Sequence, residues 1–536
     1  MEKLIFSQQR RTTYHVLIIS LFFSFLLISL NWGEIIDDAY IFFRYARNLA
    51  SGYGYVYNRG EHVEGTTSVT WTLLLAVFAY FDAPMESTAK ILSFLCILAL
   101  VALIWWFFYK NKTPASITLF ILALLIADKN FNKSLMMGLE TGVYSLLLVT
   151  FFITAASFGR QRFSPLILGL VGIFLFLTRP ESIALLLLIS CGLMLFYFDK
   201  LKEILQTTGI WLVGILLISF WRLNSFGDFI PNSVRAKSVL GLMLQDWSIL
   251  WHRLIAGASY FKGWFLSSWL LILLGLIGWI FLLKRKPFQG YVLGAIVFVG
   301  MAPVVVNSGD WMPFYRLLTP LLGIATLLAG ACLKEIQTSL TTLLSKWLKV
   351  VIIVGTIVMY SNSFLSLQSN GFFVQQPKWP KAICYERTGE ILHPYLSEQS
   401  VVVPEALGAT SYQLADVYIL DLFGLTDSFI ARNGVIPFET YNFGKQHYEY
   451  VMQREPDLFF FHSYLTNHIP SLNDWGYSEK YKTFMLVDEK CDLLIGIKLS
   501  MVDTLLPVLE SAFRVQLVDT IDLPKNDEKT WPQGEK

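Results

Sequence analysis

The sequence predicts an α-helical polytopic membrane protein with about eleven transmembrane helices, followed by a small C-terminal α/β domain outside the cytoplasm. Of its 536 residues, 54% are hydrophobic and 15% are charged, and the formal net charge is +2. Soluble domains carry about 25% charged residues, so this composition indicates a membrane protein and excludes a basic nucleic-acid-binding protein. From about residue 380 the long apolar runs give way to alternating short strands and amphipathic helices.

The apolar runs are long enough, or nearly so, to cross roughly 30 Å of hydrocarbon. They lie at about 15–32, 89–109, 114–127, 140–158, 164–178, 181–198, 206–221, 263–283, 289–306, 315–333 and 349–367. The first run lacks a small-residue cleavage site after it, so we expect it to remain as an anchor. Counting the shorter run at 66–84 as a span would place Lys110 and Lys112 outside, so we expect a helix on the outer membrane surface there.

The orientation follows from the basic residues, which gather in alternate loops, from Arg10 and Arg11 before the first span to Lys346 and Lys349 before the last. The positive-inside rule places these loops in the cytoplasm. The acidic residues gather in the opposite loops, which we expect to face the periplasm of a bacterial inner membrane. An odd number of spans places the C-terminal domain on that side too.

Three regions are expected along the chain. They are a membrane domain over 1–367 that includes a first external loop over 33–88, a periplasmic α/β domain over 368–510, and a polar, disordered tail over 511–536. In the α/β domain the sequence predicts a helix over 380–396, strands within 401–409 and 417–425, and a helix and strand over 445–461. Cys384 and Cys491 fall in this domain, where an oxidising compartment would allow them to pair.

Five segments expected at the outer face carry charged side chains beside a span, and all but the first also contain glycine or proline. They are DDAYIFFRYARN at 37–48, MGLETG at 137–142, LTRPES at 177–182, FGDFIPNSVRAK at 226–237 and NSGDWMPFYRLLTP at 307–320. A cavity lined by both signs of charge suits sugar transfer from a lipid phosphate, because the acceptor hydroxyl needs a base and the departing phosphate needs cations. The candidate base is Asp37 or Asp38. The candidate phosphate ligands are Arg44, Arg47, Arg179, Arg235, Lys237 and Arg316, and the candidate pocket residues are Glu64, Glu140, Glu181, Asp228, Asp310 and Trp311.

Structural roles compete with these chemical ones. Either aspartate of the acidic pair would serve as the N-cap of the helix that follows. Arg179 would pair locally with Glu181, Arg316 with Asp310, and Glu140 would interact with the helix dipole.

No histidine or cysteine spacing predicts a zinc site. A divalent cation held by Asp37, Asp38 and a phosphate fits the acidic pair, but adjacent carboxylates are too common to require one. We therefore expect no cofactor beyond such a cation.

The stretch DDAYIFFRYARNLASGYGYVYNRGEHVEGTTSVTWTLLLA, at 37–76, resembles the first external loop of the GT-C superfamily of polyprenyl-phosphate-sugar glycosyltransferases. The resemblance is to the branch around the mycobacterial terminal arabinofuranosyltransferase and the Legionella LphB-type proteins. Later motifs of that branch are resembled, in the same order, by 135–148, 177–182, 226–238, 309–320 and 420–432. This resemblance implies an inverting transferase with a polyprenyl-phosphate-sugar donor, a glycan or glycolipid acceptor, and a base at Asp37 or Asp38, of which we favour Asp37. The departure at GTTSVTW, 65–71, leaves the sugar and the acceptor open.

Two other functions share parts of this pattern. A polymerase or ligase that transfers a whole glycan from a lipid carrier would also have an external acidic loop. A transporter or flippase of a lipid-linked saccharide would show repeated halves and charged or broken spans at the midplane. The polar motifs gather on one side instead, which favours the transferase.

Overall fold

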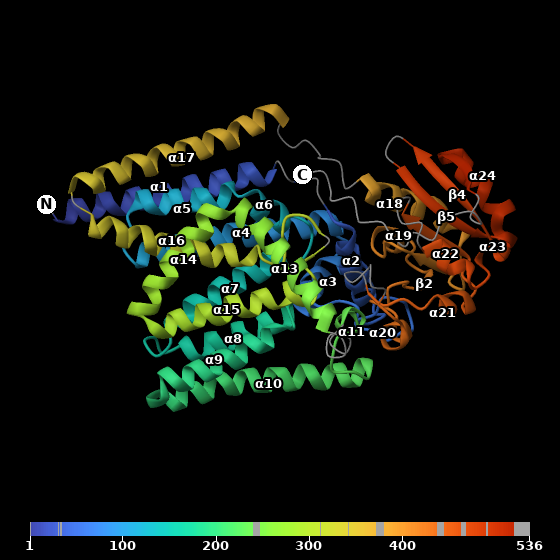
Figure 1. Ribbon diagram of the computed structural model, residues 1–536, viewed down its shortest axis with the longest axis horizontal. Coiled ribbons are helices and arrows are strands. Elements are labelled where there is room, and N and C mark those ends of the chain that lie inside the picture. Colours follow the sequence, from blue (N-terminus) through green and yellow to red (C-terminus); the bar gives the residue numbers. More distant parts are fainter. Residues whose placement is uncertain are drawn as a thin grey trace. The chain divides into compact units, whose positions relative to one another are not determined.

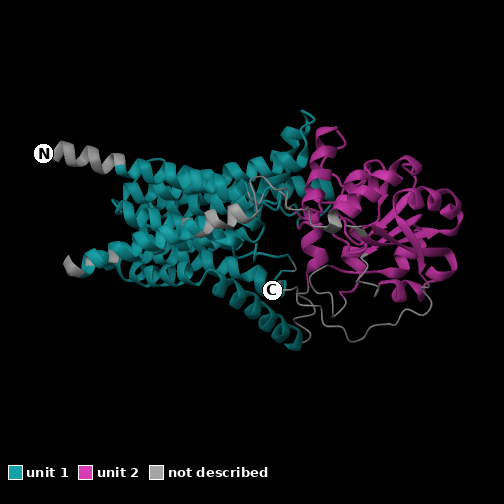
Figure 2. Cartoon of the chain, turned by 90° about the horizontal axis from the view of Figure 1, so that it is seen from above, with its two compact units in different colours: residues 1–35, 67–229, 239–377 teal, residues 36–66, 230–238, 378–536 magenta. Residues whose placement is uncertain are grey.

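The computed structural model describes residues 2–29, 32, 35–238, 247–310, 312–340, 342–370, 380–436, 444–462, 468–488 and 491–518. The chain divides into two compact units, which Figure 2 shows in different colours. Unit 1 comprises 1–35, 67–229 and 239–377, and unit 2 comprises 36–66, 230–238 and 378–536. Unit 2 thus combines part of the first predicted external loop and a short internal segment with the C-terminal region.

Unit 1 is helical (Figure 1). Its long elements are α1 (Glu2–Ser29), α4 (Met85–Lys110), α5 (Ala115–Ala127), α7 (Thr141–Ala156), α8 (Ser164–Thr178), α9 (Ser182–Phe196), α10 (Leu201–Phe226), α13 (Trp247–Ser267), α14 (Trp269–Arg285), α15 (Pro287–Val306), α16 (Pro320–Ser339) and α17 (Thr342–Asn370). Two shorter helices are α3 (Val69–Ala79) and α6 (Lys129–Leu135). Within the described residues, ten of the eleven predicted apolar runs each fall mostly on one of these helices, which confirms the helical membrane class.

The run at 263–283 does not form one straight helix as predicted. It crosses a break between α13 and α14, which meet at Ser268 with a bend of 99°. A second break, of 59°, separates α5 from α6. By length and composition, five described helices are able to span a membrane, or seven when each bent pair is one span, so the number eleven stays a prediction.

Close packing of α14 against α16 depends on small residues. A side chain on Gly278 would lie 2.2 Å from the backbone oxygen of Leu328, and one on Gly275 would lie 3.2 Å from Ala325. Glycine at these positions lets the two helix backbones approach, as is common between membrane helices. The surrounding core is aliphatic and aromatic, with Leu322, Leu327 and Val292 fully buried.

Unit 2 is an α/β structure around a six-stranded mixed sheet, with strand order β2-β1-β3-β5-β4-β6. The strands are β1 (Val401–Pro404), β2 (Tyr418–Ile419), β3 (Leu458–His462), β4 (Tyr481–Asp488), β5 (Cys491–Lys498) and β6 (Arg514–Val518). The central β1 pairs in parallel with β2 and β3, whereas β5, β4 and β6 continue the sheet antiparallel. The predicted α/β class with a partly parallel sheet is therefore confirmed.

Helices of unit 2 come from all three of its segments. They are α2 (Asp37–Ala50), α11 (Asn232–Lys237), α18 (Pro380–Leu392), α19 (Ala409–Gln413), α20 (Ser428–Asn433), α21 (Tyr448–Gln453), α22 (His468–Asn473), α23 (Tyr477–Lys480) and α24 (Val502–Ala512). Cys384 on α18 is disulfide-bonded. The side chain of Cys491, its predicted partner, lies outside the described residues.

The ordered structure extends further than the sequence suggested. The polar tail was predicted to begin at 511, but α24 ends at Ala512 and β6 follows it, pairing with β4 from Arg514 to Val518. The alternation of Val515 and Leu517 with polar residues supports a strand at the edge of the sheet. Residues 519–536 lie outside the described part of the chain.

Candidate active site

The acidic pair opens α2. Ile36 is the N-cap residue and makes no side-chain cap, while Asp37 and Asp38 occupy the first turn. Neither aspartate is therefore the N-cap that sequence reasoning allowed. Both remain half-buried, and carboxylates in a first helical turn interact favourably with the helix dipole.

Both oxygens of Asp37 accept hydrogen bonds from the C-terminal region of unit 2. Gly408 N–H donates to Oδ2 and Ala409 N–H donates to Oδ1, each at 2.8 Å. A Cβ atom on Gly408 would lie 1.9 Å from the backbone oxygen of Asp37 and 2.8 Å from its carboxylate carbon. Glycine is the only residue that leaves room for this contact, so position 408 fixes where the carboxylate lies.

The surroundings of Asp37 make it a stronger base than an ordinary aspartate. Burial raises the pKa of Asp37 to about 6, the neighbouring Asp38 charge raises it too, and the N–H groups of Ala409 and Gly408 lower it. Each oxygen keeps a second lone pair beyond the one that accepts the backbone hydrogen bond. The group is thus positioned, ionised near neutral pH and able to accept a proton.

Arg44 was predicted to bind phosphate, and the structure contradicts this. The side chain is 1% exposed, and it donates to the backbone oxygens of Tyr57, Ser411, Leu414 and Val417 and to Oδ1 of Asn58. A guanidinium has five N–H donors, and these five contacts use them all. Arg44 therefore fastens α2 to residues 411–417 and has no donor left for a substrate.

Arg47 lies one turn along the same helix and is only half-buried. Its Nη2 donates to the backbone oxygen of Tyr412 at 2.7 Å, and its guanidinium lies 4.3 Å from the centroid of the Tyr412 ring. This cation–π contact and hydrogen bond orient the side chain without burying it. Arg47 stays a candidate phosphate ligand.

Another predicted segment joins unit 2 through Asn232, which sequence reasoning did not single out. Its backbone N–H donates to the oxygen of Glu64, and its Nδ2 donates to the oxygens of Gly424, Leu425 and Asp427. The side chain thereby fixes α11 to the LFGLTD turn, and Glu64 is buried beneath it at 2% exposure. Arg235 and Lys237 follow on α11, both half-buried, and remain candidate cations.

The other predicted charged residues are in unit 1, where Arg179 is the centre of a buried ion cluster. Its guanidinium contacts Glu140 at 3.2 Å and Glu181 at 3.8 Å, and it lies 4.7 Å from the centroid of the Tyr144 ring. The three ions stand at helix ends, because Glu140 precedes α7, Arg179 follows α8 and Glu181 precedes α9. The predicted local pair with Glu181 is present, and the contact with Glu140 is closer.

Arg316 pairs with Asp310, as the structural alternative proposed, with Nε 2.5 Å from Oδ2. The segment that carries them is strained, since Ser308, Phe314 and Tyr315 all have positive φ without being glycine. Such conformations cost about 1–3 kcal/mol each and gather at functional sites. Arg316 lies within electrostatic reach of Arg179, so Glu140, Arg179, Glu181, Asp310 and Arg316 form one charged cluster.

Two lysines missed by sequence reasoning border this cluster. Lys133 and Lys129, one helical turn apart on α6, lie 4.9 Å and 5.9 Å from the centroid of the Phe314 ring. Their sequence signal was the stretch DKNFNK, which interrupts an apolar region with two lysines four residues apart. Asp228 follows Gly227, whose left-handed conformation ends α10, and Trp311 lies outside the described residues.

A bound cation is not supported by any larger ligand set. Within the described ranges, no group of three or more histidine, cysteine, aspartate or glutamate side chains is arranged to hold a metal ion. The backbone N–H groups on both oxygens of Asp37 further disfavour a protein cage at that position. A cation held by one or two carboxylates and a substrate phosphate stays a prediction.

Comparisons of sequence point to one enzyme and one domain family. Over 79 residues the chain is 38% identical to the terminal β-(1→2)-arabinofuranosyltransferase of Mycobacterium tuberculosis. That match covers 14% of this chain and 13% of the relative. Residues 375–495 match the model of a domain of unknown function, DUF8728, and nearly all of this range belongs to the C-terminal segment of unit 2, 378–536.

Comparisons of structure cover nearly the whole chain. The archaeal oligosaccharyltransferase AglB from Archaeoglobus fulgidus, in complex with an inhibitory peptide and a dolichol-phosphate, superposes with a TM-score of 0.53 over 90% of this chain and 74% of that chain, at 10% identity. ArnT from Cupriavidus metallidurans, bound to undecaprenyl phosphate, gives a TM-score of 0.52 over 90% of this chain and 97% of that chain, also at 10% identity. Likeness at this identity establishes the fold, and it confirms the predicted resemblance at that level.

Proposed function

We propose that this chain, which has the fold of the GT-C superfamily, is an inverting glycosyltransferase that moves a sugar from a polyprenyl-phosphate donor to a cell-envelope glycan or glycolipid. The observation that carries the proposal is the Asp37 carboxylate, held by two backbone N–H groups with its pKa raised to about 6. An ordinary aspartate is a weak base at neutral pH, whereas a pKa near the working pH suits general-base catalysis.

The reaction follows from the chemistry of that carboxylate. Asp37 takes the proton of the acceptor hydroxyl as the hydroxyl oxygen forms a bond to the anomeric carbon of the sugar. The bond from that carbon to the carrier phosphate breaks on the opposite face, so the configuration inverts and the polyprenyl phosphate leaves with the electron pair. The charge of the neighbouring Asp38 contributes to the raised pKa of Asp37.

The departing phosphate carries negative charge that must be stabilised. In unit 2 the candidate cations are Arg47, Arg235 and Lys237, and in unit 1 they are Arg179 and Arg316. The ion pair with Asp310 holds the Arg316 guanidinium through Nε, which lies 2.5 Å from Oδ2. A planar guanidinium suits bidentate contact with phosphate.

The donor assignment is supported by what the similar structures contain. One is a complex with a dolichol-phosphate and the other is bound to undecaprenyl phosphate, and both molecules are polyprenyl phosphates. We place this chain in a bacterial inner membrane with Asp37 and the C-terminal region in the periplasm, because basic and acidic residues segregate to alternate loops. No nucleotide sugar is available there, so the donor is lipid-linked.

Mass spectrometry of surface glycans and lipid-linked intermediates in a strain lacking the gene tests this function. A single-sugar transferase predicts glycans that lack one residue. Loss of a whole glycan chain, with the complete oligosaccharide still attached to its carrier, would identify a polymerase or ligase instead. Accumulation of the donor on the cytoplasmic face would identify a flippase.

A further inference from the structure

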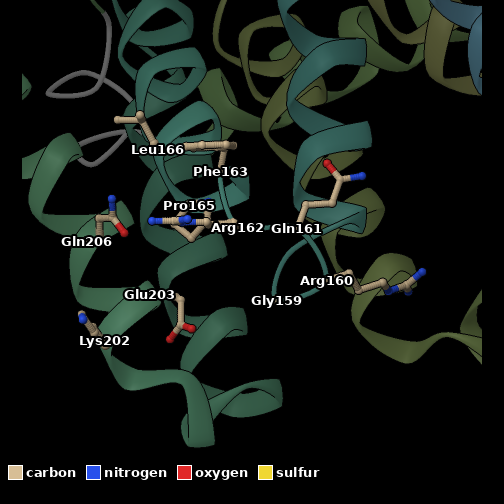
Figure 3. Close-up of a pocket in the computed structure, with 10 residues that line it drawn as sticks. All are labelled: Gly159, Arg160, Gln161, Arg162, Phe163, Pro165, Leu166, Lys202, Glu203 and Gln206. Atoms are coloured by element: carbon tan, nitrogen blue, oxygen red, sulfur yellow. The ribbon is translucent and has the colours of Figure 1, made fainter.

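A cavity in unit 1 lies at the end of the helices opposite the charged cluster. It has a volume of about 470 Å³ and is lined by residues of the α7–α8 turn and of the first turns of α8 and α10 (Figure 3). Arg179 follows the last residue of α8, and α8 has 15 residues, so the cavity lies about 22 Å from that cluster along the helix. The two sites are therefore separate.

The cavity is electropositive. Its lining includes Arg160, Arg162 and Lys202 and the single carboxylate Glu203. Figure 3 shows Arg162 extending over the α8 N-terminus toward the side from which Lys202, Glu203 and Gln206 project, whereas Arg160 points away. Arg162 and Lys202 are therefore the cations best placed to serve a ligand.

Two helix N-termini reinforce this charge. Both α8 and α10 begin at the cavity, and neither has a side-chain cap on its first turn. The helix dipole at such ends attracts anions, and it is the dipole that acts here, because in α8 the Ser164 N–H already donates to Gln161 and Pro165 carries no N–H. Gly159, in a left-handed conformation, accepts a hydrogen bond from Lys200 and holds the turn between α7 and α8 in place.

Apolar side chains border the cavity on its exposed side. Phe163 and Leu166, which line it, are 64% and 40% exposed, and Ile167 and Leu170 continue along α8 with similar exposure. On α10, Leu205 is another exposed apolar side chain. Cations at a membrane helix end beside exposed apolar side chains match a phosphate head group with acyl chains attached.

We infer that this cavity binds the phosphate head group of an anionic phospholipid in the membrane leaflet at that end, with Arg162 and Lys202 as its ligands. The site is independent of the proposed transferase chemistry. Its role is to fix the turn between α7 and α8, and with it the α7–α8 helix pair, to the membrane surface.

Native mass spectrometry of the purified full chain tests the inference, with phosphatidylglycerol and phosphatidylcholine as probes. The combined Arg162→Gln and Lys202→Gln variant is expected to bind phosphatidylglycerol at least about tenfold more weakly, because each charge-assisted contact is worth roughly a factor of ten. Phosphatidylcholine binding should not change. Arg162→Lys, which keeps the charge, should retain most of the binding.

A matched control removes two cations at the same end of unit 1. Lys284 and Lys286 are exposed near the turn before α15, and Gln289 in the first turn of α15 donates to Ala156 at the end of α7. The combined Lys284→Gln and Lys286→Gln variant should bind phosphatidylglycerol normally. If both double variants lose phosphatidylglycerol binding equally, the proposed site is wrong. If inorganic phosphate fully displaces phosphatidylglycerol, the cavity binds a soluble anion instead of a lipid.

Discussion

The carboxylate of Asp37 and the backbone of Gly408 are in direct contact, with Gly408 N–H donating to Oδ2 at 2.8 Å. These residues lie 371 positions apart in the chain. The contact gives the C-terminal region, which matches a domain of unknown function, a defined task in the proposed mechanism. That task is to position the base.

Gly408→Ala should lower transfer by about 10²-fold, because even a 1 Å displacement of a catalytic group has an effect of that size. The new methyl group would lie 1.9 Å from the Asp37 backbone oxygen, so the turn must move away from the carboxylate. Glycan restoration in a strain lacking the gene measures the effect. Gly209→Ala is the matched control, since a Cβ on Gly209 in α10 meets open space. Normal transfer by Gly408→Ala would show that the contact is dispensable.

The pH dependence of transfer should report the Asp37 carboxyl. Its pKa is raised to about 6, so transfer should rise as pH increases through about 6 and the base loses its proton. Asp38→Asn removes a charge that raises this pKa, so the rising limb should move to lower pH. Rates in isolated membranes between about pH 5 and about pH 8 test both statements. If the rising limb of the pH–rate profile is unchanged in Asp38→Asn, the pH dependence does not come from the Asp37 carboxyl.

The same pKa shift makes a statement about stability. Because the folded protein holds the Asp37 proton more tightly than the unfolded chain does, this group favours folding below its unfolded pKa of 3.8 and loses that contribution as pH rises through about 6. In the natural protein, the titration of Asp37 should lower the melting temperature as pH rises from 3.8 to about 6. The Asp37→Asn variant has no such carboxyl and should lack this decrease. The melting temperatures of the purified proteins across that interval measure it, and identical pH slopes would contradict the assignment.

Arg316 allows a test that separates phosphate binding from structure. Arg316→Lys should raise the donor concentration needed for half-maximal rate, because lysine keeps the charge but loses the planar fork, and Arg316→Ala should do worse. If the residue only pairs with Asp310, the single variants should lower the melting temperature and the double variant should recover part of the loss. Normal donor dependence in Arg316→Ala at normal stability would remove the residue from the site.

The sequence predicted more of the fold than of the side-chain roles. The apolar runs located the helices of unit 1, and short runs rich in Val, Ile and Phe located β1, β2 and β3, because both signals are local in the sequence. The break at Ser268 was missed, since no proline or charge marks it. The strand β6 was also missed, because its alternation of apolar and polar residues covers only five positions and a charged tail follows.

The roles of the arginines depended on contacts that the sequence does not encode locally. Arg44 and Arg47 look alike in sequence, but Arg44 donates to three backbone oxygens of residues 411–417 and Arg47 to one. Gly408 was not singled out, because its importance arises from a close approach to a distant residue. Long-range packing of this kind requires the structure.

Reporter fusions test the orientation of the chain in the membrane. Alkaline phosphatase fused after about residue 370 should be active, because that position is expected outside the cytoplasm, and a fusion after Lys286 should be inactive. The same reporter after Lys112 provides a second cytoplasmic control. The reverse pattern would place Asp37 in the cytoplasm and allow a nucleotide-sugar donor.

The effect of Asp37→Asn on glycan transfer, compared with that of Asp38→Asn at matched expression, tests directly whether Asp37 is the base. The amide lacks proton-accepting ability and sets an N–H group against one of the two backbone donors, so transfer should fall by about 10²–10⁴-fold, as expected when a general base is lost. Asp38→Asn should retain transfer with an altered pH profile. Full glycan restoration by Asp37→Asn, in a strain that lacks the natural protein, would contradict the central claim that Asp37 is the base.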